Sequence, residues 1–163
     1  MDEVMFWKII DAARSGASGD CGVVADGLVE DLSDRTVEEV VGFSVVFDQL
    51  MDRAYSWELW GAAYVINGGC SDDGFEYFRA WLVVQGQAVF EAALANPESL
   101  VEVAQVDAEC EDALYVAAQA YQHLTGSNEL PRRYAPHPRE PSGVEWTEDD
   151  LPARYPRLTA AFG

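Results

Sequence analysis

Basic residues are scarce in this chain of 163 residues, which holds 10 Lys and Arg against 29 Asp and Glu, for a formal net charge of -19. Nucleic-acid binding usually needs a basic face that releases counterions, so this scarcity argues against a nucleic-acid partner and against an anionic membrane. An acidic surface keeps a protein soluble and leaves cations and basic proteins as candidate partners.

Long apolar runs are also absent. No run approaches the roughly 18 residues of a membrane-spanning helix, and Asp2 and Glu3 stand where a signal peptide would carry basic residues. We therefore expect a cytoplasmic protein that does not enter a membrane. Its 49% hydrophobic and 12% aromatic residues are nevertheless sufficient for a packed core, and its length is that of one domain.

Cysteine is rare as well. Cys21, Cys70 and Cys110 stand far apart, and none belongs to a C-x-x-C pair. This spacing argues against a zinc site, and an odd number of cysteines in an intracellular chain predicts three free thiols. No calcium-loop pattern is present, so we expect neither a metal nor a cofactor.

Proline is nearly missing from the first 130 residues, and six of the seven prolines lie in residues 131–163. Residues 1–130 hold 24 acidic and 5 basic residues, whereas residues 131–163 hold 5 of each. We expect an acidic helical domain over 1–130, then a proline-rich tail over 131–163 with a short helix starting near Thr147. Trp146 and Tyr155 should anchor this tail on the body. Its arginines should face the acidic body: Arg132, Arg133, Arg139, Arg154 and Arg157.

Apolar residues recur at helical spacing throughout the body, and most of these runs follow a capping residue. The pattern predicts helices over residues 3–15, 20–32, 37–54, 57–66, 74–95 and 107–124, with another beginning at Pro97. No alternating strand pattern of useful length occurs. The predicted fold class is all-α: a single compact multi-helix domain with an extended proline-rich C-terminal tail packing on the body.

Residues 55–81 hold eight of the 19 aromatic residues and the only cation between Arg53 and Arg132, which is Arg79. A lone cation in a long acidic stretch predicts a carboxylate partner. We expect Arg79 to pair with Asp72 or Asp73 in a partly buried site.

The run from Ala54 to Leu82 resembles the signature of the bacterial family called domain of unknown function 4240. Phe6-Trp7, the stretch 90–97 and the closing segments 146–151 and 155–158 are similar to that family too, so the likeness covers nearly the whole chain. The resemblance implies a small bacterial cytosolic protein. It carries over no catalytic residues.

The turn that joins the helices predicted on either side of residues 67–71 carries the candidate site. Free backbone N–H groups, two carboxylates and an aromatic wall would meet there. We interpret the protein as a non-enzymatic binding or regulatory module with a small-ligand or protein site at the corner 67–79. The expected ligand-binding residues are Trp57, Trp60, Asn67, Cys70, Ser71, Asp72, Asp73 and Arg79.

Other interpretations of these residues stay open. Core packing explains the aromatic residues, and helix capping explains the two aspartates. One alternative function is an enzyme acting on a small substrate through Asp72, Asp73 or Cys70, since a helix N-terminus lowers a thiol pKa. Another is an acidic decoy for a basic partner, which predicts carboxylates on a convex face without a pocket.

Overall fold

The computed structural model describes residues 1–132, 134 and 136–163. This part of the chain forms helices and no strand, apart from an isolated bridge between Ser56 and Ser142. The α-helices are α1 (Glu3–Arg14), α2 (Cys21–Ser33), α3 (Val37–Arg53), α4 (Trp57–Asn67), α5 (Asp72–Val84), α6 (Gln87–Ala95), α7 (Val116–Thr125), α8 (Leu151–Arg154) and α9 (Pro156–Phe162). The 3-10 helices are η1 (Pro97–Glu102), η2 (Glu111–Tyr115) and η3 (Glu148–Asp150). The prediction of an all-α single domain is confirmed.

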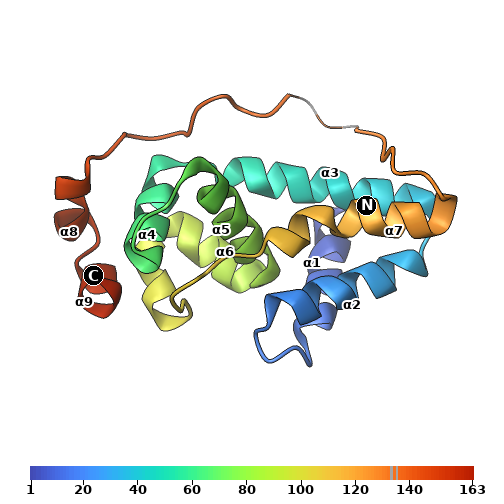
Figure 1. Cartoon of the computed structure of the whole chain (residues 1–163), viewed down its shortest axis with the longest axis horizontal. Coiled ribbons are helices and arrows are strands. Elements are labelled where there is room, and N and C mark those ends of the chain that lie inside the picture. The colour runs from blue at the N-terminus through green and yellow to red at the C-terminus, as the bar shows by residue number, and fades with distance from the viewer. Residues whose placement is uncertain (133, 135) are drawn as a thin grey trace.

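Helix α3 runs along the body, with α1, α2 and α7 at one end and α4, α5 and α6 at the other (Figure 1). Fully buried phenylalanines from four helices, α1, α3, α5 and α6, meet in one core: Phe6, Phe43, Phe75, Phe78 and Phe90. No helix in the described part of the chain is long and apolar enough to cross a bilayer.

The predicted caps account for where α1, α3 and α5 begin. The Asp2 carboxylate accepts a hydrogen bond from the Met5 N–H at 2.8 Å, and Thr36 and Glu39 form a reciprocal capping box at the start of α3. The Ser71 hydroxyl accepts from the Gly74 N–H at 3.1 Å, which starts α5. These interactions join residues three apart, so the sequence alone could predict them.

Two predicted helices are shorter than expected. The helix predicted over 74–95 is divided into α5 and α6 because Gly86 has φ +91°, and a Cβ there would lie 2.9 Å from Asp11 of α1. The helix predicted over 107–124 begins only at η2, since Asp107 has φ +66°. Both breaks occur where a distant segment approaches the backbone.

The prediction of three free thiols is wrong. Cys21 and Cys110 form a disulfide with a Cα–Cα distance of 5.7 Å, and Cys70 alone is free. The bond joins the first residue of α2 to the residue before η2, which the sequence separates by 89 positions. A disulfide is unusual in the reducing cytoplasm, so the cytoplasmic location stays a prediction.

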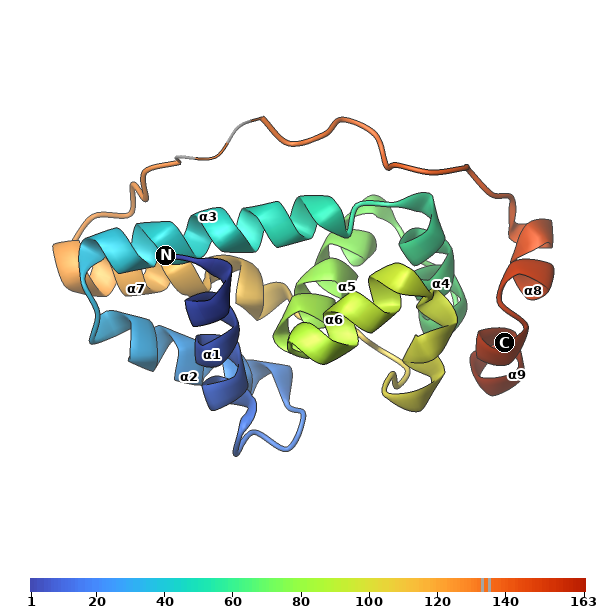
Figure 2. The same ribbon diagram turned by 180° about the vertical axis from the view of Figure 1, so that it is seen from behind.

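The tail returns to the body at α4. As Figure 2 shows, it leaves the end of α7, follows α3 on the outside and ends with α8 and α9 beside α4. The Trp146 indole N–H donates to the Trp57 carbonyl at 2.7 Å, and the Tyr155 hydroxyl donates to the Glu58 carbonyl at 2.6 Å. Both predicted anchors are confirmed.

The tail arginines follow the prediction only in part. Arg157 pairs with Glu102 of η1 at 2.7 Å, whereas Arg154 donates to the Val144 carbonyl of the tail itself. Arg139 is exposed, and Arg133 lies outside the described residues. The predicted helix start at Thr147 is present, because its N–H donates to the Asp150 carboxylate at 2.8 Å ahead of α8.

Candidate functional site

At the corner between α4 and α5, the polar side chain of Asn67 is hydrogen-bonded to the loop before η2. The Asn67 amide oxygen accepts from the Ala108 N–H at 3.0 Å, and the Asn67 amide N–H donates back to the Ala108 carbonyl at 3.4 Å. Both polar groups of Asn67 therefore hold the loop before η2. Asn67 positions this loop and has no donor or acceptor group without a partner.

The two tryptophans of the predicted site also have structural partners. Trp57 and Trp60 stack with ring centroids 5.2 Å apart, and Trp60 stacks on Phe75 at 4.9 Å. The Trp60 indole N–H donates to the Cys70 carbonyl at 3.0 Å. These contacts join α4 to α5 and fill the corner with two half-buried tryptophans packed on the buried Phe75 ring.

Cys70 does not have the environment of a reactive thiol. Burial, together with the negative charge of Glu109, raises the pKa of the Cys70 thiol to about 12. The positive end of α5 was expected to lower this pKa, but the charge of Asp72 in the first turn of α5 also raises it. Cys70 is therefore protonated at neutral pH and a poor nucleophile.

Alkylation should detect this protection. In the native protein at pH 8, iodoacetamide should modify Cys70 about 100 to 1000 times more slowly than it modifies an exposed thiol, because the thiolate fraction falls tenfold for each unit of pKa. Mass spectrometry gives the rate, and the same protein in urea should react at the ordinary rate. Fast native modification of Cys70 would contradict this description.

Arg79 has no carboxylate partner within the described residues, so the predicted ion pair with Asp72 or Asp73 is wrong. Asp72 lies about two turns from Arg79 along α5, roughly 10 Å away, which is too far for direct pairing. Arg79 instead donates to the Met51 carbonyl at 2.9 Å, and its guanidinium lies over Tyr55 at 4.6 Å. Burial lowers its pKa, but an arginine stays charged.

Two substitutions of Arg79 should separate the contribution of its charge from that of its packing. Arg79→Ala should lower the free energy of unfolding by about 2 to 3 kcal/mol, because it removes a charged hydrogen bond and contacts with two rings. Arg79→Met keeps the apolar stem and removes a half-buried charge, so it should cost about 1 kcal/mol or less. Urea denaturation measures both variants. Equal costs would show that the charge, and not the packing, matters.

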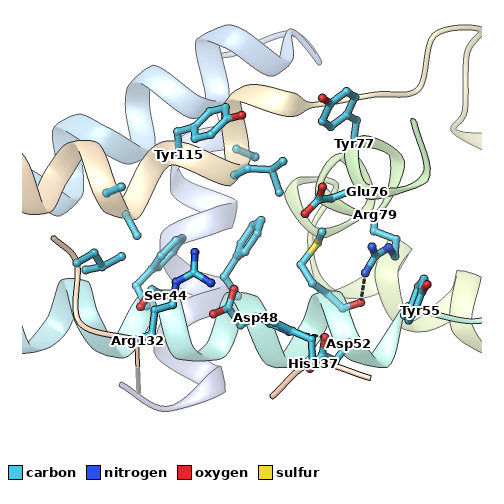
Figure 3. Close-up of a pocket in the computed structure, with 18 of the residues that line it drawn as sticks. Ser44, Asp48, Asp52, Tyr55, Glu76, Tyr77, Arg79, Tyr115, Arg132 and His137 are labelled. Carbon is cyan, nitrogen blue, oxygen red and sulfur yellow. Dashed lines mark hydrogen bonds and ion pairs between the residues drawn. The ribbon is translucent and has the colours of Figure 1, made fainter. Parts of the chain in front are cut away.

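A cleft of about 1080 Å³ lies between α3, α5 and the η2–α7 segment, with part of the tail along its edge (Figure 3). Aromatic side chains form much of its wall: Phe43, Phe47, Tyr55, Tyr77 and Tyr115. Its described lining includes six carboxylates, which are Asp48, Asp52, Asp72, Asp73, Glu76 and Glu129. Only Arg79, Arg132 and His137 oppose them. The cleft is thus acidic and aromatic.

Asp48 and Asp52 are the least exposed of these acids. Burial raises the pKa of Asp48, and within the described part of the chain no hydrogen bond or ion pair reaches its carboxylate. The Asp52 side chain is 14% exposed and lies 2.8 Å from His137 Nδ1. Asp72, Asp73 and Glu76 are exposed on the α5 side of the cleft, where water weakens their effect.

Three of the sequence-predicted site residues, Asp72, Asp73 and Arg79, line this cleft. The other five do not: Trp57, Trp60, Asn67, Cys70 and Ser71 lie at the corner. Sequence reasoning missed Asp48 and Asp52. The sequence could have indicated them, because two acids at i and i+4 on a helix repel each other unless a cation pairs with them.

No curated protein and no solved structure matches this chain. A match to the family described as "Protein of unknown function (DUF4240)" covers residues 1–123, which include α1 to α6 and most of α7. The match ends before the tail, so the similarity of the tail segments to this family stays a prediction. The chain belongs to the DUF4240 family of proteins of unknown function.

Proposed function

We propose that this protein is a non-enzymatic binding module whose cleft between α3, α5 and η2–α7 takes a ligand with an amine or guanidinium group. The observation that carries the proposal is Asp48, a half-buried carboxylate with a raised pKa and no hydrogen bond or ion pair among the described residues. Such a carboxylate lowers the stability of the folded protein unless a cation pairs with it.

The walls of the cleft support a cationic ligand as well. Tyr77 and Tyr115 flank the α5 and η2 sides (Figure 3). Phe43 and Phe47 of α3 also line the cleft. Aromatic faces attract amines and guanidinium groups, and this attraction strengthens where water is excluded. An acidic centre surrounded by rings therefore favours an organic cation over an anion.

The alternative of an enzyme using Asp72, Asp73 or Cys70 has less support. The Cys70 thiol has a pKa of about 12, and Cys70 does not line the cleft. The two aspartates are exposed in the first turn of α5. The acidic-decoy alternative predicted no pocket beneath the acids, whereas here carboxylates line a cleft.

Thermal-shift and calorimetric titrations with arginine amide and spermidine test the proposal. Both cations should raise the melting temperature and bind with measurable affinity, while glutamate should do neither. Asp48→Asn should weaken binding at least tenfold, because a charged hydrogen bond contributes about 1.5 to 3 kcal/mol. Affinity should also fall as salt is added.

Asp26→Asn is the matched control. Asp26 is exposed on α2 and does not line the cleft, so this variant removes the same negative charge at another place. Because the pKa of Asp48 is higher in the folded than in the unfolded protein, its ionisation lowers the stability of the fold as pH rises above the pKa of the unfolded state. Asp48→Asn should thus fold at pH 7 at least as stably as the wild type. Equal losses of affinity in both variants would rule out a specific site.

A further inference from the structure

We infer that the partner of the cleft is an extended peptide bearing arginine or lysine, and that Arg132 and His137 of the chain itself occupy the positions of this partner's side chains in the free protein. The inference rests on the proposed function and names the ligand class of the same cleft.

The first observation is that the tail already places the charged Arg132 and the imidazole of His137 in the acidic cleft. His137 Nδ1 lies 2.8 Å from the Asp52 carboxylate. The Arg132 side chain points into the cleft beside Ser44 and Asp48 (Figure 3), and its charge opposes the rise in the pKa of Asp48. Both residues come from one proline-rich segment, so the occupant is itself a piece of extended basic chain.

The second observation is that this occupant is held weakly. Among the described tail residues from 131 to 141, no backbone group forms a hydrogen bond with the body, and the first to do so is Ser142. Its N–H donates to the Tyr55 carbonyl at 3.0 Å. Arg132 and His137 are exposed, so water screens their side of these contacts. An external chain can replace such contacts at small cost while the anchored end of the tail remains attached.

The size and charge of the cleft favour a peptide over a single small cation. Its volume of about 1080 Å³ stands at the upper end of the roughly 300 to 1000 Å³ of small-molecule sites. Carboxylates stand on both long sides, with Asp48 and Asp52 on α3 and Asp72 and Glu76 on α5. A chain with two or more cationic side chains can contact both sides, whereas one amine contacts one.

The experiment uses the full-length protein and a fluorescent peptide with the sequence of residues 128–138. Fluorescence anisotropy should show saturable binding of this peptide and none of a version with glutamine in place of both arginines. The double variant Arg132→Ala/His137→Ala should bind the arginine peptide about five- to tenfold more tightly, because the internal competitor is weakened.

Two controls separate competition from a change in overall charge. Arg139→Ala removes the same charge from an exposed tail position outside the cleft lining and should leave the affinity unchanged. His137→Ala alone removes no formal charge as counted at pH 7, and it should still increase the affinity.

The outcomes distinguish this inference from the proposed function. Equal or weaker peptide binding by the double variant would overturn competition by Arg132 and His137. If arginine amide bound as tightly as the peptide, that result would overturn the peptide partner. Either result leaves a cation-binding cleft in place. Absence of binding by arginine amide, spermidine and the peptide in all variants would instead overturn the proposed function.

Discussion

Reduction of the Cys21–Cys110 disulfide should lower the free energy of unfolding by about 4 kcal/mol. The bond closes a loop with a sequence separation of 89, and the chain-entropy relation gives about 4 to 5 kcal/mol for a loop of roughly 90 residues. Urea denaturation with and without dithiothreitol measures the difference. Titration of denatured, unreduced protein should find one thiol, that of Cys70.

Two variants provide the controls for the disulfide. Cys21→Ser/Cys110→Ser should lower stability by a similar amount and should no longer respond to the reductant. Cys70→Ser should keep the full response, since Cys70 takes no part in the bond. A wild-type protein equally stable in reductant would contradict the expectation, and a count of three thiols without reductant would show that the bond does not form.

Gly61→Ala should cost about 3 kcal/mol and release the tail from the body. A Cβ at position 61 would lie 2.7 Å from the Tyr155 ring and hydroxyl and 3.0 Å from the Trp146 indole nitrogen. Tyr155 is 4% exposed and hydrogen-bonded to the Glu58 carbonyl, so its ring has little room to move. The variant must either strain α4, at about 1 to 3 kcal/mol, or give up buried side chains such as Leu158.

Urea denaturation and limited proteolysis together measure this effect, and faster cleavage within residues 139–163 is expected. Gly27→Ala is the matched control, because a Cβ in the middle of α2 meets only Ala13 at 3.8 Å. That substitution should be neutral or add up to about 1 kcal/mol, the gain of Ala over Gly inside a helix. Unchanged stability and cleavage in Gly61→Ala would show that α4 and the tail do not pack this closely.

Asp48 shows how much of a binding site can be predicted from sequence alone. The pattern of apolar residues around it predicted α3, but the carboxylate becomes informative only when the tail and α5 bring His137 and Glu76 to the same cleft. The sequence instead drew attention to the corner at Asn67, whose backbone turns are clear from neighbouring residues. The functional interpretation therefore moved from a local motif to a surface made by distant segments.

The sequence by itself determined most of the helices and the starts of α3 and α5, because the capping box of Thr36 with Glu39 and the bond from Gly74 to Ser71 join residues three apart. It also determined the acidic surface and the apolar faces that form the core. Only the tertiary structure decided the break at Gly86, the bond between Cys21 and Cys110, and the partners of Arg79. Each of these depends on contacts between segments far apart in the chain, and such contacts arise from packing in three dimensions, which local spacing does not encode.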